Sequence, residues 1–155
     1  MEVHNAWHDK ITSEITLHQE TLSKKDTKKY KLDLLLRVAK RIADFSFECG
    51  GCQLSQQEIT TLTQDLGNLV QMPDKGGRKR YLKKINRIVK HLQSEHKLVT
   101  QGQNVGLWIA IGSGIGVALG AGMDNVGGGI PIGIAIGTAV GIALDAKAKR
   151  EDRVI

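Results

Sequence analysis

Seven glycines recur at four-residue intervals in the most apolar part of the chain. They form two series, Gly112, Gly116 and Gly120 and then Gly129, Gly133, Gly137 and Gly141. Residues four apart share a face of a helix, so each series would form a ridge. In water such helices are poor, because Gly costs about 1 kcal/mol relative to Ala. In lipid the backbone must satisfy its own hydrogen bonds, and small residues let two helices approach closely. The spacing therefore predicts membrane helices that pack through their glycines.

The glycines lie in two uncharged segments, residues 104–123 and 126–144. Each has about the 20 residues that a helix needs to cross roughly 30 Å of hydrocarbon. Between them lie Asp124 and Asn125, which are good helix N-caps, and Pro131 is tolerated in a first helical turn. The pair therefore predicts a helical hairpin. Two alternatives stay open: a soluble Gly-rich hairpin, and a parallel-sheet core, because β-branched and small residues alternate in IPIGIAIG.

This half of the chain resembles the glycine-zipper membrane hairpins of many small bacterial proteins. The resemblance rests on the same seven glycines and covers mainly residues 106–144. It implies close-packed membrane helices that are often oligomeric, and it implies no particular activity. The whole chain is also similar to uncharacterised bacterial proteins that end in such a hairpin and a short basic tail.

Charge divides the chain near residues 101–106. Residues 1–105 carry 18 of the 22 Lys and Arg, whereas Asp124 is the only charged residue of the two glycine-rich segments and their turn. We expect three parts: a cytoplasmic helical bundle at 1–100, a two-helix transmembrane hairpin at 104–145 and a basic cytoplasmic tail at 146–155.

Basic residues flank the hairpin on both sides, and the turn between its arms has none. The positive-inside rule therefore predicts that both termini are cytoplasmic and that the turn is outside. The polar N-terminus lacks the pattern of a secretory signal, so we expect the protein in the inner, cytoplasmic membrane of the cell.

The N-terminal half shows four segments with apolar residues at helical spacing and no convincing period-two alternation. The segments lie near residues 5–24, 27–49, 55–72 and 78–98. Ser55 and Glu58 match a capping box, which predicts that the third helix begins there, and we expect it to stop before Pro73. The apolar stripe of the fourth segment consists of Leu82, Ile85, Val89 and Leu92. Short connections favour an up-down bundle.

The fourth segment also carries a basic face. Its members are Lys79, Arg80, Lys83, Lys84, Arg87 and Lys90. Because this segment precedes the hairpin closely, we expect the face to contact anionic lipid headgroups, where each charge contributes on the order of 1 kcal/mol. An ordinary solvated face is one alternative. Nucleic acid is another, and it is disfavoured because Tyr81 is the only aromatic residue in the patch and no base-reading motif is present.

The motif Cys49-Gly-Gly-Cys52 lies between the second and third segments. One interpretation is a tight turn that ends a helix, with one of the glycines at positive φ and the thiols packed as small apolar groups. A second is a zinc site, because His91 and His96 add an H-x4-H pair, although the gap of 38 residues is long for a compact zinc finger. A third is a redox-active dithiol, for which the βαβ context of thioredoxin-like motifs is missing.

These patterns predict an all-α protein, with a bundle of about four helices followed by a glycine-zipper transmembrane hairpin. No catalytic constellation stands out, so we expect a non-enzyme without a cofactor, with zinc at the Cys/His set as the alternative. The leading hypothesis is a membrane-anchored structural or interaction protein whose hairpin drives homo-oligomerisation or assembly into a larger membrane complex. One alternative is a pore-forming protein, for which Ser113 and Thr138 are the only hydroxyls in the arms. Another is a small subunit of a membrane complex with a metal or redox site.

Overall fold

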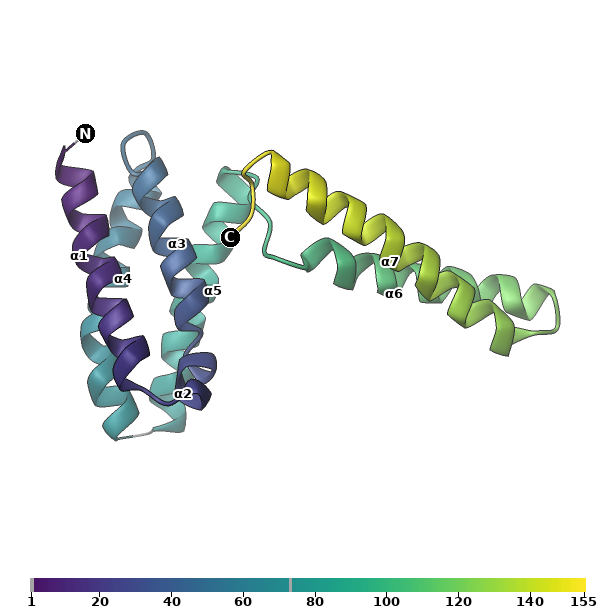
Figure 1. The fold of residues 1–155 in the computed structure, drawn as a ribbon, viewed down its shortest axis with the longest axis horizontal. Helices are drawn as coiled ribbons and strands as arrows, with labels where there is room; N and C mark the ends of the chain where they lie inside the picture. The colour runs from purple at the N-terminus through teal and green to yellow at the C-terminus, as the bar shows by residue number, and fades with distance from the viewer. Residues whose placement is uncertain (1, 73) are drawn as a thin grey trace. The chain divides into compact units, whose positions relative to one another are not determined.

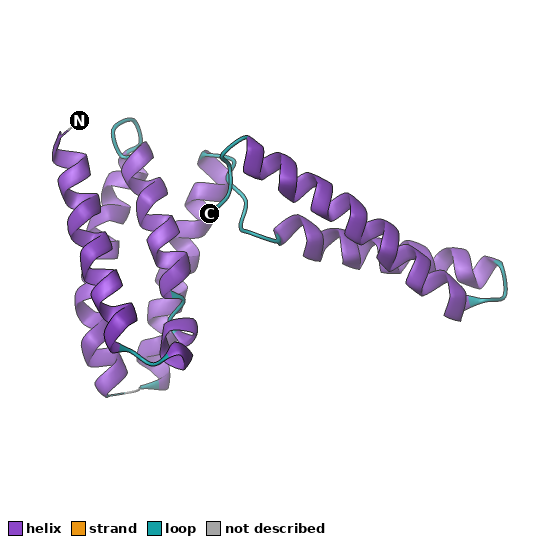
Figure 2. Ribbon diagram, in the orientation of Figure 1, coloured by secondary structure: helices purple, strands orange, loops and turns teal. Residues whose placement is uncertain are grey.

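The computed structural model describes residues 2–72 and 74–155. They divide into two compact units, with the boundary between Lys97 and Leu98. Within the described ranges every regular element is a helix, as Figure 2 shows. This confirms the prediction of an all-α protein with a bundle followed by a hairpin.

The first unit is a bundle of four long helices with one short additional helix; Figure 1 labels these elements. The long helices are α1 (Glu2–Thr21), α3 (Leu32–Phe45), α4 (Gly50–Gln71) and α5 (Lys75–Glu95), and the short one is α2 (Lys24–Lys29). Helix α3 contacts each of the other three long helices. Helix α4 likewise contacts α1, α3 and α5, so α3 and α4 each border all the other long helices.

Apolar side chains from all four long helices form the core. Among those with no exposed surface are Ile11, Ile15, Leu35, Ile42, Ile59, Leu66, Ile85 and Leu92. Each buried side chain of this size contributes about 1.5–3 kcal/mol relative to an exposed one. The amphipathic spacing in the sequence thus places the core where the bundle needs it.

The second expected helix, near residues 27–49, is divided in two. Lys31 is the N-cap of α3 and has φ 54°, in the left-handed region, which interrupts the helix after α2. Nothing in the local sequence indicates this, because Lys has no preference for that region. The break places the buried ring of Tyr30 so that its hydroxyl donates to the carbonyl oxygen of Leu69, at 2.9 Å.

Helix α4 begins earlier than the capping box predicts. Its first residue is Gly50, and its N-cap is Cys49, at φ −120° and ψ 110°. Ser55 lies inside the helix, where its hydroxyl donates to the carbonyl oxygen of Gly51 at 2.8 Å. The predicted start at Ser55 is wrong because the Gly-Gly pair is helical. The helix ends at Gln71; Pro73 lies outside the described residues.

Helix α5 begins at an acidic cap and buries a stripe that differs slightly from the predicted one. Both carboxylate oxygens of Asp74 accept backbone hydrogen bonds, from Gly76 and Gly77. The buried residues of the helix are Gly77, Tyr81, Ile85, Ile88, Val89 and Leu92. Leu82, expected in this stripe, is half-exposed. The helix is rotated toward Tyr81 because that ring packs against Tyr30.

The second unit is a hairpin of two antiparallel helices, α6 (Gln103–Gly122) and α7 (Val126–Arg150), which run side by side (Figure 1). The Asn125 side chain caps α7 by accepting a hydrogen bond from the Gly128 amide at 3.0 Å. We expected Pro131 in the first turn of α7, but it falls in the second turn. Because proline has no backbone N–H, one hydrogen-bond donor of that turn is missing.

Backbone hydrogen bonds close the open end of the hairpin. Val99 and Val154 form a parallel β-bridge. The Val99 amide donates to the carbonyl oxygen of Arg153 at 2.8 Å, and the Ile155 amide donates to that of Val99 at 2.9 Å. Helix α7 continues to Arg150, past residue 145, where the hairpin was expected to end.

Candidate functional site

All seven glycines of the two series face the opposite helix of the hairpin. A Cβ atom at Gly116 would lie 2.5 Å from the carbonyl oxygen of Gly129, and one at Gly141 would lie 2.5 Å from the Cα of Val105. No side chain fits at either position, so the two backbones are in direct contact. The glycines with this property are Gly112, Gly116, Gly120, Gly129, Gly133, Gly137 and Gly141.

Other glycines of α6 lie on open surface. A Cβ at Gly106, Gly114 or Gly122 would have no atom of a neighbouring group within 4 Å. The helix therefore contains two classes of glycine, one required by close packing and one that packing leaves free. Gly114 lies two residues from both Gly112 and Gly116 and provides an internal control for them.

The large apolar side chains of the hairpin point outward. Leu119 is 60% exposed, Ile132 62% and Ile136 61%, whereas the buried residues of α6 are glycines. A soluble helical protein shows the reverse arrangement, with its large apolar side chains inside. Helices α6 and α7 have 20 and 25 residues, and both are long and apolar enough to cross a membrane.

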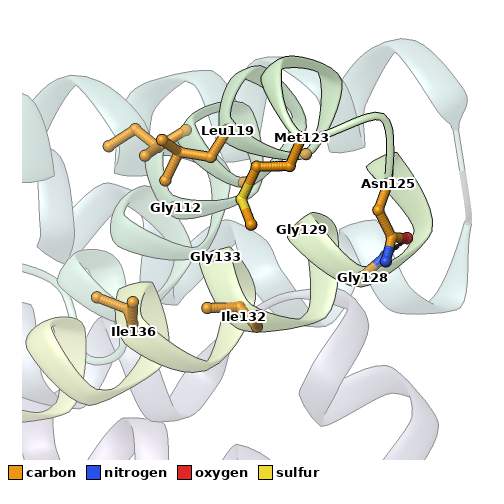
Figure 3. Close-up of a pocket in the computed structure, with 12 residues that line it drawn as sticks. Gly112, Leu119, Met123, Asn125, Gly128, Gly129, Ile132, Gly133 and Ile136 are labelled. Carbon is orange, nitrogen blue, oxygen red and sulfur yellow. Dashed lines mark hydrogen bonds between the residues drawn. The ribbon is translucent and has the colours of Figure 1, made fainter.

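An apolar groove of about 310 Å³ runs along one face of the hairpin near the turn. Figure 3 shows Leu119 of α6 and Met123, the residue after this helix, on one side, and Ile132 and Ile136 of α7 on the other. Glycines of both helices also line the groove. The groove exists because glycines leave space between the outward-pointing side chains.

The opposite end of the hairpin is held by the carboxylate of Asp145. One oxygen accepts hydrogen bonds from the backbone and side-chain amides of Asn104, at 3.2 and 2.8 Å, and the other accepts from the Val105 amide at 3.4 Å. Asp145 on α7 therefore caps the first turn of α6, where the helix dipole favours a negative charge.

The two hydroxyls of the arms are satisfied within their own helices. Ser113 donates to the carbonyl oxygen of Ala110 at 2.9 Å, and Thr138 donates to that of Ile134 at 2.7 Å. Both side chains are exposed or partly exposed on the helix surfaces. Hydroxyls bonded in this way tolerate an apolar environment, because no donor is left unpaired.

Four side chains with metal-ligating atoms converge in the first unit. Cys49 and Cys52 lie at the start of α4, and His91 and His96 lie at the end of α5. Their ligand atoms all lie within 4.8 Å of one another. The Nε2 atom of His91 is 3.3 Å from Cys49 Sγ and 3.5 Å from Cys52 Sγ, and the Nε2 atom of His96 is 3.3 Å from Cys52 Sγ. The antiparallel pairing of α4 and α5 thus spans the gap of 38 residues.

Two packing contacts position the imidazole rings. Phe45, the last residue of α3, stacks on His96 with ring centroids 4.0 Å apart and planes inclined by 15°. The ring of His91 lies on the backbone of Gly51, where a Cβ atom would be 2.5 Å from its Cε1. A Cβ at Gly50 would meet nothing within 4 Å. The two glycines of the motif therefore have different structural roles.

The interpretation of the motif as a helix-ending turn is wrong. Of the described glycines, Gly102 is the one with positive φ, and Gly50 and Gly51 are the first two residues of α4. The motif starts a helix, which places the two sulfur atoms at the positive end of the helix dipole. Cys52 is fully buried and Cys49 partly so.

Burial shifts the pKa values of Cys52 and His96 in opposite directions. Desolvation is the main cause that raises the pKa of the Cys52 thiol to about 12; a hydrogen bond that this thiol donates to Cys49, and the charge of Cys49, add to the effect. Desolvation and the neighbouring His91 lower the pKa of His96, against a smaller opposing effect of Glu95. The imidazole of His96 is therefore neutral at neutral pH and has a nitrogen lone pair available, whereas the Cys52 thiol needs a nearby positive charge to ionise.

The basic side chains predicted on α5 lie on its outer surface. Lys79, Arg80, Lys83, Arg87 and Lys90 are exposed and Lys84 is half-exposed. Arg80 lies 3.6 Å from Asp74, and Arg87 lies 3.6 Å from Glu58 of α4. Half-exposed Leu82 lies beside Lys79 and Lys83 in a shallow surface hollow. The basic face thus includes an apolar side chain among its cations.

Three residues of these sites were missed from the sequence. Gly51 could not be separated from Gly50, because only the position of His91 distinguishes them. Phe45 carries no signal for a contact with a histidine far along the chain. Asp145 has the weak signal of a lone acid at the end of an uncharged segment, which could have suggested a cap.

No protein-family model, curated protein or solved structure matches this chain.

Proposed function

We propose that the protein is a membrane-anchored structural or interaction protein, with the hairpin in the bilayer and the bundle on the cytoplasmic side. The observation that carries this proposal is the inverted packing of α6 and α7. Glycines meet inside the hairpin, and large side chains such as Ile132 and Ile136 point outward. Contiguous apolar surface of this extent is rare on soluble monomers and typical of contact with lipid or with another chain.

The flanking charges support an orientation with both termini inside. The segment before the hairpin is rich in Lys and Arg, and α7 ends with Lys147, Lys149 and Arg150 in its last turn. The turn has Asp124 and no basic residue. Under the positive-inside rule this asymmetry favours a hairpin inserted in the inner membrane with the bundle in the cytoplasm.

The basic face of α5 supports contact with anionic headgroups. Leu82 lies among Lys75, Arg78, Lys79 and Lys83. Such a combination of cations around one apolar side chain suits an interface at which the charges meet phosphates and the leucine reaches the acyl region. Binding of nucleic acid is less favoured, because Tyr81, the aromatic residue of this segment, is buried and cannot stack on a base.

The glycine-zipper character of the hairpin belongs to this proposal, as does its resemblance to small bacterial membrane proteins. The glycine faces are occupied by contacts within one chain. Association with further copies or with other subunits would therefore use the outward Ile, Leu and Val side chains, or the bundle. We propose a homo-oligomer or a larger membrane complex assembled through these surfaces.

We do not favour a pore, because the arms offer no polar stripe. The hydroxyls of Ser113 and Thr138 bond to their own helices, and a channel would need polar groups directed into its lumen. An enzymatic role has no support in the geometry of the hairpin or of the basic face.

Carbonate extraction of membranes tests the proposal. The wild-type chain should stay in the membrane pellet. The Ile115→Lys variant should be recovered in the pellet less completely, because Ile115 is 52% exposed at the middle of α6 and a Lys at a helix centre costs about 2.5–3.5 kcal/mol on insertion scales. The Ile115→Val variant is the matched control and should behave as wild type. Release of the wild-type chain by carbonate would contradict the proposal.

A further inference from the structure

We infer that the Cys49, Cys52, His91 and His96 side chains form a structural Zn²⁺ site. This inference goes beyond the proposed membrane role and does not depend on it. It rests on the distances among the four ligand atoms, on the chemistry of the donor set and on the packing that holds the rings in place.

The distances match the edges of a tetrahedron around zinc. With Zn–S bonds of about 2.3 Å and Zn–N bonds of about 2.0–2.1 Å, the S–N edges of a tetrahedral site are about 3.6 Å long. The three S–N distances in the structure are 3.3, 3.5 and 3.3 Å. The remaining pairs also lie within 4.8 Å. A metal ion at the centre therefore requires only small side-chain adjustments.

Hydrogen bonds alone do not account for this grouping. A neutral imidazole nitrogen without a proton accepts one hydrogen bond, yet His91 Nε2 lies close to both sulfur atoms. Cys52 Sγ is in turn shared between the two histidines. Four groups around one point, rather than two separate pairs, are the arrangement that a shared central ion produces.

The donor set selects the metal and the role. Two thiolates and two imidazoles in a tetrahedral arrangement suit Zn²⁺, and two thiolates balance its charge. All four positions are filled by protein atoms, so no coordination position is open for a substrate, which indicates a structural ion. Binding would release the thiol protons, because the ligands are thiolates.

The site would join elements that are distant in sequence. It ties the first turn of α4 to the end of α5, and Phe45 adds the end of α3 by stacking on His96. His96 stands two residues before Leu98, where the second unit begins in the sequence. Zinc would therefore fix the end of the bundle from which the chain continues into the hairpin.

The glycines of the motif make a sharp test. Gly51 must lack a side chain for His91 to approach, whereas Gly50 faces open space. Both are consecutive residues in the same helical turn. Gly51→Ala should weaken metal binding by about 10–100-fold, the range typical of residues that orient a ligand. Gly50→Ala should change it by no more than a few-fold.

The experiment uses the full chain, purified in detergent under reducing conditions and stripped of metal. Co²⁺ is titrated as a spectroscopic probe, and Zn²⁺ is then added. We expect one Co²⁺ per chain, with strong visible bands of tetrahedral coordination and thiolate charge-transfer bands, and complete displacement by Zn²⁺. Cys52→Ser should lose the charge-transfer intensity and the tight binding, whereas His8→Ala, outside the cluster, should match the wild type.

Three results would overturn the inference. The first is a reduced, folded wild-type chain that gives no thiolate–Co²⁺ bands. The second is metal binding that Cys52→Ser and Gly51→Ala leave unchanged. The third is a Cys49–Cys52 disulfide as the stable form recovered from cells, which would indicate a redox role. The wild-type titration decides even if a cysteine variant fails to fold, and it is independent of membrane insertion.

Discussion

The ring of Tyr30 meets the ring of Tyr81 edge-on, with centroids 5.7 Å apart and planes inclined by 82°. Both side chains are buried, but their hydroxyls differ. That of Tyr30 donates to the Leu69 carbonyl oxygen, whereas that of Tyr81 has no hydrogen-bond partner among the described residues. Desolvation, with a smaller contribution from Tyr30, raises the pKa of Tyr81 well above its ordinary value, so the hydroxyl stays protonated.

This pair gives opposite expectations for two identical substitutions. Tyr81→Phe removes an unsatisfied buried hydroxyl and should leave the bundle equally stable or stabilise it by about 1 kcal/mol. Tyr30→Phe leaves the Leu69 carbonyl without its side-chain donor and should destabilise the bundle by about 1 kcal/mol. Urea unfolding followed by the fluorescence of Trp7, in the bundle, measures both. Equal destabilisation by the two variants would show that Tyr81 has a partner.

Gly116→Ala and Gly114→Ala test whether the glycine faces are packing surfaces. A Cβ at Gly116 would lie 2.5 Å from the Gly129 carbonyl oxygen, so the helices must separate, at a cost of about 1–3 kcal/mol. Gly114→Ala meets open space and should be neutral or slightly stabilising. The fraction of SDS needed to separate the arms, followed by Trp108 fluorescence in a Trp7→Phe background, compares them. Equal effects would refute the packing role.

Asp145→Asn should loosen the open end of the hairpin. The substitution keeps one acceptor but removes the charge that favours the first turn of α6. We therefore expect the hairpin to lose about 1 kcal/mol of stability at this end. Hydrogen exchange at the Asn104 and Val105 amides should become faster. Asp124→Asn, in the turn, is the control, because Asn tolerates the φ of 49° there. If exchange at the two amides is unchanged, the carboxylate is not their cap in the membrane.

Met123→Cys tests the orientation of the hairpin. Met123 lies in the turn and is 78% exposed, and, unlike Asn125, its side chain does not cap α7. An impermeant maleimide added to intact cells should label this variant. The wild-type chain and Lys149→Cys should stay unlabelled, because their cysteines would be cytoplasmic. Labelling of Lys149→Cys but not of Met123→Cys would reverse the proposed topology.

The carboxylate of Asp74 contributes to the stability of the bundle in a way that depends on pH. Hydrogen bonds from the Gly76 and Gly77 amides, and the charge of Arg80, hold the pKa of this carboxyl below its ordinary value of 3.8. A depressed pKa stabilises the folded state above the unfolded pKa, and this contribution is lost as the pH falls through the folded pKa. Asp74→Asn should therefore be less stable than wild type at neutral pH, and the two should converge in acid. A difference that persists unchanged into acid would show that charge plays no part.

The glycine faces could be located from the sequence because the helix period alone determines them. Gly116 and Gly120 share a face in any helix, and the absence of charge marks both segments as long and apolar enough to cross a membrane. The start of α4 could not be located in this way. Its Gly-Gly pair is a poor helix former by itself, and it becomes helical in a tertiary setting where His91 lies against Gly51.

The four side chains of the Cys/His cluster could be predicted from the sequence only in part. Their types and local spacings are visible in the sequence, which is why zinc could be considered. Their convergence depends on the pairing of α4 with α5, and the stacking of Phe45 on His96 depends on α3 as well. The break at Lys31 and the rotation of α5 toward Tyr81 are likewise set by packing, so local patterns did not reveal them.

The touching backbones of α6 and α7 also restrict how far one helix can slide along the other. Sliding one helix along the other by a single residue would press a side chain of one arm onto the backbone of the other. A slide of four residues, about 6 Å along the axis, would bring glycine back to glycine. The allowed registers are therefore discrete. The short turn capped by Asn125 and the bond of Asp145 to Asn104, at opposite ends, select one of them.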